Sequence, residues 1–251
     1  AYVDSQTNDR LTFRQLNERA NQIAYSLVTS GIRPGDRVAL LLMNSVEFMA
    51  SYFGIAKMGG VVVPLNWRLL ADELEFILHD SGCTLIIYGE EFVDTVEDLQ
   101  ARGDKTAVQQ WWMVTQSLPL SSFSENFHGL LTRSSVEEPA LGAGDDDILY
   151  IMYTSGTTGL PKGVVHTHST SLWALFTIAI TCDLRDVDRY LVALPMFHVG
   201  SLTPVTLNVY RGVTSVVMRE FDPTRAWELI QEESISTGLL VPAMLNFMFQ
   251  V

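Results

Sequence analysis

The chain has 251 residues, of which 47% are hydrophobic, so it can bury a substantial core in one large domain or two small ones. It carries 16 Lys plus Arg against 29 Asp plus Glu, and the formal net charge of -13 disfavours nucleic acid and acidic lipid as partners. Apolar stretches such as residues 172–182 are too short to cross a bilayer, and no signal-peptide pattern opens the sequence. Because the net charge is negative, a bound phosphate would have to be held by local groups.

Two cysteines lie about a hundred residues apart, Cys83 and Cys182, and cannot form a disulfide framework or a thiolate metal cluster. We therefore expect the protein to lie in a reducing cytoplasm, and we expect both thiols to lie in the core. The sequence begins with Ala1 and ends at Val251 inside an expected helix. We interpret it as a fragment of a longer chain.

The first half predicts strands and helices in alternation. Apolar residues at three- to four-residue spacing from Phe13 to Leu27 predict a helix, with Thr12 and Gln15 as its capping pair. Short continuous apolar runs predict buried strands. The strands are expected at 38–43, 61–63, 85–88 and 111–114, and further helices from Ser45 to the Gly59–Gly60 pair, over 72–79 and over 92–101.

The second half repeats this order after a polar connection. Residues 116–147 are rich in Ser, Pro, Gly and acidic residues without sustained period, which predicts a surface connection between two subdomains. Strands are then expected at 148–153, 163–165, 190–194, 213–218 and 237–241, with helices near Ser169, after Gly200, behind the Asp222 cap and after Pro242. We predict an α/β fold of two parallel-sheet subdomains flanked by helices, residues 1–140 and residues 141–251.

One loop carries the chemistry. The segment from Thr154 to Gly163 holds four hydroxyls, three glycines and one lysine between two expected strands. Glycines let backbone N–H groups approach a ligand, hydroxyls donate hydrogen bonds, and a lysine supplies the charge that phosphate oxygens favour. The loop is therefore predicted to cradle a polyphosphate.

Other readings of this loop fit less well. A Walker loop needs Gly five residues after its first Gly and Ser or Thr after its Lys, where this chain has Pro161 and Gly163. A G-x-S-x-G hydrolase elbow is excluded because Tyr153 stands where its first Gly should be. A plain glycine and threonine turn rarely needs four hydroxyls and a lysine.

The stretch from Tyr153 to Gly163 resembles the signature loop of the superfamily of acyl-CoA synthetases, nonribosomal-peptide adenylation domains and luciferases. Segments 11–13, 35–39, 59–66 and 195–198 agree with it in family order. The resemblance implies that a carboxylate attacks the α-phosphorus of Mg-ATP to give an acyl-adenylate and pyrophosphate, and that a thiol such as coenzyme A then takes the acyl group. It also implies a set of groups that hold the β and γ phosphates: Thr154, Ser155, Gly156, Thr157, Thr158, Gly159 and Lys162, with Lys162 the first catalytic candidate.

His198 is the second catalytic candidate, because it matches a family position beside the substrate carboxylate and the acyl pocket. From the residues alone, a His next to Met196 and Phe197 is more often a satisfied core residue, and only the resemblance reverses this preference. Val199 and Met244 are candidate pocket residues, and ordinary core packing explains Met244 equally well.

No metal site is predicted from protein side chains. His166 and His168 alternate on an expected strand, but no third ligand with suitable spacing accompanies them. The acidic run 145–147 is more typical of a solvated turn than of a magnesium site.

These patterns favour an acid:CoA ligase. Residues 197–201 lack the acidic residue with which amino-acid adenylation pairs a substrate ammonium, and residues 66–69 resemble fatty and aryl acyl-CoA synthetases. The expected ligands are ATP, Mg²⁺, coenzyme A and a fatty or aryl acid, with no nucleic acid, and self-association stays open. A carrier-protein or oxygen acceptor and a nucleotide-binding module without chemistry remain as alternatives. The family's magnesium carboxylate, ribose-binding acid and lid lysine would lie beyond Val251, so the chain alone is expected to be inactive and to lack the C-terminal lid domain.

Overall fold

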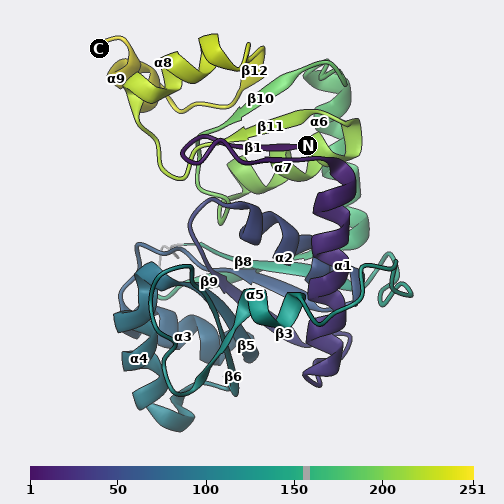
Figure 1. Ribbon diagram of the computed structural model, residues 1–251, viewed down its shortest axis with the longest axis vertical. Helices are drawn as coiled ribbons and strands as arrows, with labels where there is room; N and C mark the ends of the chain where they lie inside the picture. The colour runs from purple at the N-terminus through teal and green to yellow at the C-terminus, as the bar shows by residue number, and fades with distance from the viewer. Residues whose placement is uncertain (155–158) are drawn as a thin grey trace. The chain divides into compact units, whose positions relative to one another are not determined.

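The strands form two sheets in the computed structural model, which describes residues 1–154 and 159–251 (Figure 1). Both sheets are mainly parallel and carry helices, as the sequence predicts for an α/β fold. The contacts divide the chain into two units: unit 1 comprises residues 1–17, 43–49 and 171–251, and unit 2 comprises residues 18–42 and 50–170. The expected fold class is confirmed.

Unit 2 is built around a seven-stranded sheet in the order β7-β6-β5-β3-β4-β8-β9. Neighbours from β7 to β8 are parallel, and β9 is antiparallel to β8. The strands are β3 (Arg37–Leu41), β4 (Val61–Pro64), β5 (Cys83–Gly89), β6 (Gln110–Val114), β7 (Ser124–Asn126), β8 (Ile148–Thr154) and β9 (Lys162–Thr167). The helices are α3 (Ala71–Ser81), α4 (Val93–Ala101) and α5 (Phe127–Leu131), with parts of α1 (Phe13–Thr29) and α2 (Val46–Lys57).

The central strands of this sheet are apolar without alternation because both faces are covered. Four consecutive residues, Val38 to Leu41, are completely buried although their side chains point alternately to the two faces. One face packs against α3 and α4 through Leu74, Ile77 and Leu99. Helices α1 and α2 approach closely at Gly54, where a Cβ would lie 2.7 Å from Cβ of Ile23.

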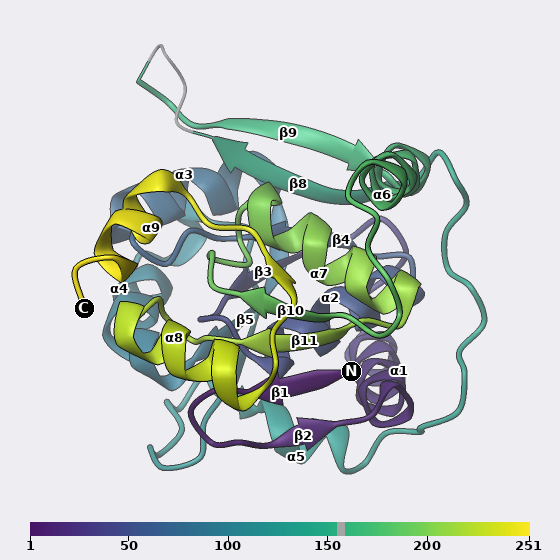
Figure 2. The same ribbon diagram turned by 90° about the horizontal axis from the view of Figure 1, so that it is seen from above.

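Unit 1 contains a five-stranded sheet in the order β12-β10-β11-β1-β2 (Figure 2). Strand β1 is parallel to β11 and antiparallel to β2. The strands are β1 (Tyr2–Asp4), β2 (Arg10–Leu11), β10 (Arg189–Val192), β11 (Thr214–Val217) and β12 (Thr237–Gly238). The helices are α6 (His168–Thr181), α7 (Val199–Arg211), α8 (Pro223–Glu232) and α9 (Pro242–Met248), of which α6 begins in unit 2.

The two units are not the continuous segments 1–140 and 141–251 that the sequence predicted. Strand β8 pairs with β4 through Val62 and Tyr150, so the hairpin that carries the phosphate loop belongs with the first sheet. Strand β1 pairs with β11, so the first residues of the chain belong with the later sheet. Pairing between segments so distant in sequence is set by tertiary packing and leaves no local pattern.

The connection expected from 116 to 147 contains structure of its own. Strand β7 extends the large sheet, and α5 buries Phe127 and Leu131. Gly142 lies against the end of α2, where its N–H donates to the carbonyl of Lys57 and a Cβ would come within 2.1 Å of the carbonyl oxygen of Met58. The expectation that both cysteines lie in the core is correct for Cys83 and wrong for Cys182, which is exposed.

Glu90 gives unit 2 a pH-dependent contact. Its carboxylate accepts hydrogen bonds from the hydroxyls of Thr115 (2.6 Å) and Ser117 (2.9 Å) and from the N–H of Gln116 (3.1 Å). These bonds, that of Thr115 first, lower the pKa of Glu90 from 4.5 to about 2. A lowered folded-state pKa stabilises the protein above pH 4.5, and this contribution is lost as the pH falls toward 2.

We therefore expect Glu90→Gln to be less stable than the wild type near pH 6, by about 1 kcal/mol after allowance for solvent screening. The difference should shrink between pH 4.5 and 2. Urea unfolding at several pH values measures it. A stability difference that stays constant over that range would show that the charge of Glu90 does not matter.

Candidate active site

The predicted phosphate loop joins the two strands of an antiparallel hairpin. The register between β8 and β9 ends with Tyr153 opposite Gly163 and Thr154 opposite Lys162, and we call these four residues the hairpin neck. The loop follows the carboxyl end of β8, which is parallel to β4, and ligands of parallel sheets bind at this edge.

The described loop residues suit an anion. Lys162 is exposed, and no ion pair found in residues 1–154 and 159–251 involves it, so its ammonium is available to a ligand. Thr154 is also exposed. Gly159 has φ of +97°, in the left-handed region that favours glycine. Ser155, Gly156, Thr157 and Thr158 lie outside the described residues, so their part in phosphate binding stays a prediction.

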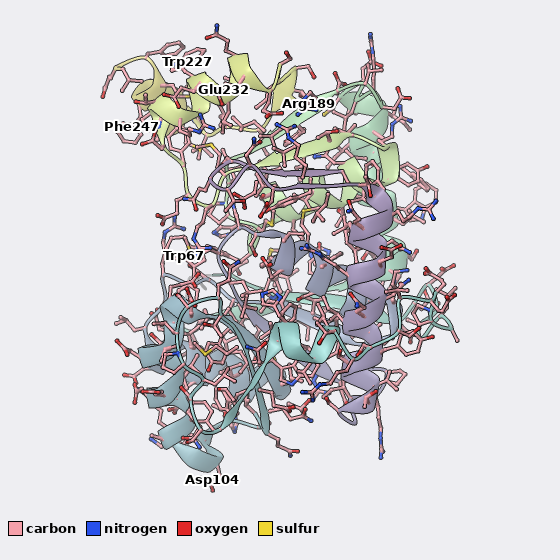
Figure 3. All side chains as sticks on the ribbon, viewed as in Figure 1. Trp67, Asp104, Arg189, Trp227, Glu232 and Phe247 are labelled. Atoms are coloured by element: carbon pink, nitrogen blue, oxygen red, sulfur yellow. The ribbon has the colours of Figure 1, made fainter. Side chains whose placement is uncertain are left out.

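The chain segment after β4 brings a second cation to the carboxyl edge of the same sheet. Arg68 places its guanidinium carbon 4.0 Å from the centroid of the Trp67 ring. Trp67 is labelled in Figure 3. This distance is typical of a cation–π contact. In the sequence, residues 66–69 showed only a family resemblance, and this pair was not predicted.

His166 lies on strand β9 and His168 is the first residue of α6. The ring of His166 stacks on Tyr150, with centroids 4.5 Å apart. Burial lowers the pKa of His168, against the opposing effect of Asp147 and Asp145. Within the described part of the chain, no group of three or more His, Cys, Asp or Glu side chains could hold a metal ion.

His198 lies in unit 1, at the start of α7. Its backbone is extended, with φ of -105° and ψ of 146°, and its carbonyl accepts the N–H groups of Ser201 and Leu202. Its ring contacts that of Phe197, with centroids 4.7 Å apart. His198 is exposed, whereas Met196 and Phe197 are buried. His198 is therefore not a core histidine. The contact of His198 with a substrate stays a prediction.

A buried amide holds the chain before His198. The Nδ2 group of Asn44 donates to the carbonyls of Leu194 (2.9 Å) and Met218 (3.0 Å), and its Oδ1 accepts from the N–H of Met196 (2.7 Å). Asn44 is 4% exposed. One side chain thus ties together the chain segments that follow β10 and β11. Asn44 could not be predicted as a site residue, because its only local signal is a polar side chain directly after an apolar run.

The two pocket candidates differ in exposure. Val199 is 53% exposed at the first position of α7. Met244 is 8% exposed and belongs to an apolar cluster with Leu191, Ala226 and Met248. The burial of Met244 in this cluster agrees with the core-packing alternative that the sequence left open. A contact of Met244 with a substrate stays a prediction.

The structure thus brings the candidate residues into two groups. Thr154 and Lys162 face each other at the hairpin neck in unit 2. His198 and Val199 are adjacent at the start of α7 in unit 1. Each group is defined within its own unit.

A glycine- and hydroxyl-rich loop with a lysine, placed at the carboxyl edge of a parallel sheet, is typical of α/β proteins that bind nucleotide phosphates. The family model described as AMP-binding enzyme matches residues 1–251. The chain belongs to this family, as its resemblance in sequence predicted.

Similar proteins of known sequence include FadD13 of Mycobacterium tuberculosis, a long-chain-fatty-acid–CoA ligase. It is 47% identical over 251 residues, which cover 100% of this chain and 48% of the relative. ScoC of Streptomyces coeruleorubidus, a fatty acid–[acyl-carrier-protein] ligase, is 37% identical over 95% of this chain and 44% of its own length. The chain therefore spans about half the length of the curated relatives it matches.

Similar solved structures include the inhibitor-bound N-terminal domain of FACL13 from Mycobacterium tuberculosis. It superposes with a TM-score of 0.92 and 46% identity, over 100% of this chain and 61% of that one.

No helix in the described ranges is both long and apolar enough to span a membrane.

Proposed function

We propose that this chain is part of an ATP-dependent acid:CoA ligase about twice its length, and that it supplies the phosphate-binding loop and the start of the acyl site. The hairpin neck carries this proposal: an exposed lysine opposite an exposed threonine at the carboxyl edge of a parallel sheet. Relatives whose names describe acid ligases support it.

A carboxylate is a poor electrophile until its oxygen becomes part of a good leaving group. In the proposed reaction the carboxylate oxygen attacks the α-phosphorus of ATP, and the bond to the β-phosphate oxygen breaks, which yields the acyl-adenylate and pyrophosphate. Lys162 and the hydroxyl of Thr154 would stabilise the charge on the departing pyrophosphate. Magnesium bound to ATP would supply further positive charge. We assign no magnesium ligand to the described residues.

The proposed acid has an uncharged fatty or aryl tail. Residues 197–201 hold no acidic side chain that could pair a substrate ammonium, and Met196 and Phe197 give the segment apolar bulk. His198 would lie beside the substrate carboxylate. A role in fatty acid metabolism and a location in the cytoplasm are part of the same proposal.

A second candidate function changes the acceptor to the thiol of a carrier protein. The similarity to ScoC favours this alternative, because the name of that relative states a carrier-protein ligase.

The test uses the ligase that contains this chain, with ATP, magnesium and a panel of fatty, aryl and amino acids. Pyrophosphate release should depend on fatty or aryl acids, and thioester should form with coenzyme A rather than with a phosphopantetheinyl carrier protein. Thioester only on the carrier protein would establish the second function. Binding of ATP without pyrophosphate release for any acid would contradict both and favour a non-catalytic nucleotide-binding module.

A further inference from the structure

We infer that Tyr153 and Asp80 are positioning residues for pyrophosphate departure, because together they fix the hairpin neck that carries Thr154 and Lys162. This inference rests on the function proposed above. We call the hydrogen-bonded side chains of Tyr153 and Asp80 the neck pair.

The side chains of Tyr153 and Ile151 leave little room for a Cβ at residue 163. Gly163 lies opposite Tyr153 in the register, and a Cβ on it would come within 3.1 Å of Cζ and 3.3 Å of the hydroxyl oxygen of Tyr153. The same Cβ would lie closer still to Ile151, 2.8 Å from its Cγ2. Unlike Gly159, Gly163 is not among the glycines with positive φ in the described chain. Close approach of the Ile151 and Tyr153 side chains, and not backbone strain, therefore favours glycine here.

The hydroxyl of Tyr153 anchors the ring to a helix. It donates to Oδ2 of Asp80 at 2.6 Å, across 73 residues of sequence. Asp80 lies in the last turn of α3, whose Leu74, Ile77 and Leu78 are at most 1% exposed in the core of unit 2. Burial and then the bond to Asp80 raise the pKa of Tyr153, so the hydroxyl stays protonated and can donate at neutral pH.

The neck pair acts where the hairpin needs support. Strand β9 is an edge strand that hydrogen-bonds only to β8 among the described strands. Tyr153 precedes Thr154 on β8, and Gly163 follows Lys162 on β9. A ring held over Gly163 and tied to α3 therefore restrains both strands beside the two phosphate-binding candidates. Restraint of this kind lowers the entropy lost when Thr154 and Lys162 bind the departing pyrophosphate.

The experiment compares single and double variants of the ligase. Tyr153→Phe removes the hydroxyl and keeps the ring, whereas Asp80→Ala removes the acceptor. Each should raise KM for ATP about 3- to 10-fold and leave KM for the acid unchanged, and the double variant should be no worse than either single one. Asp80→Asn retains an acceptor oxygen and should restore most of the affinity.

Tyr88→Phe is the matched control. The hydroxyl of Tyr88, on β5 of the same unit, also makes a 2.6 Å hydrogen bond, to Ser124, and β5 is separated from β8 by β3 and β4. This variant should not change KM for ATP. Equal effects of Tyr88→Phe and Tyr153→Phe, or additive effects of the two neck-pair variants, would overturn the inference and leave the proposed function intact.

Hydrogen exchange supplies a readout that does not depend on activity. Amides of strands β8 and β9 should exchange faster in Tyr153→Phe and Asp80→Ala than in the wild type, and Tyr88→Phe should leave them unchanged. If the wild-type ligase activates no acid, the proposed function fails, and with it the role of the neck pair in the reaction. Unchanged exchange in both neck-pair variants would refute the restraint itself.

Discussion

Replacing Lys162 by alanine is expected to lower acyl-adenylate formation by the ligase about 10- to 150-fold, which corresponds to the loss of a charge-assisted contact of about 1.5–3 kcal/mol. Lys162 is exposed at the hairpin neck, opposite Thr154, so its ammonium can reach a bound phosphate without first breaking an ion pair described in the structure. The loss should fall mainly on the first step, because pyrophosphate leaves there. Burst measurements of pyrophosphate release with saturating acid test this.

Lys105→Ala provides the control for a general effect of charge. Lys105 is an exposed lysine in the short 3-10 helix Gly103–Lys105 of the same unit. Both variants should unfold at the wild-type temperature, since neither side chain is buried, and only Lys162→Ala should slow the reaction. A folded Lys162→Ala enzyme with unchanged pyrophosphate release would contradict the assignment of this loop as the phosphate-binding loop.

The sequence predicted those elements whose own residues carry a period or a cap. Helix α1 begins behind the reciprocal bonds of Thr12 and Gln15, and α8 begins behind Asp222, whose side chain accepts the N–H of Arg225. Strand β2 has two residues and strand β7 has three, which is too short for any period to appear. Helix α5 has five residues and was hidden in a segment of polar composition.

The site shows the same division between local and distant information. The hydroxyls, glycines and lysine of the loop are contiguous, so their chemistry could be predicted from the sequence together with their resemblance to a family. Asn44 and Asp80 act on partners about 150 and 73 residues away, and a single asparagine or aspartate has no pattern that announces such a partner. The placement of the hairpin in the first sheet likewise depends on the pairing of β8 with β4.

Replacing Asn44 by alanine is expected to destabilise the protein by about 2–4 kcal/mol. The change removes three hydrogen bonds and leaves the carbonyls of Leu194 and Met218 and the N–H of Met196 without this partner in a buried site. Unfolding by urea measures the loss. Because Met196 lies two residues before His198, we also expect KM for the acid to rise more than KM for ATP.

Asn208→Ala separates this effect from the general cost of a buried amide. Asn208 is a second buried amide of unit 1, but its Nδ2 group donates one hydrogen bond, to Ser215 at 3.0 Å, and its Oδ1 has no hydrogen-bond partner among the described residues. The alanine variant should therefore cost less stability than Asn44→Ala and should leave the ratio of the two KM values unchanged. If Asn44→Ala were no less stable than Asn208→Ala, or raised both KM values equally, Asn44 would not be the residue that positions the segment before His198.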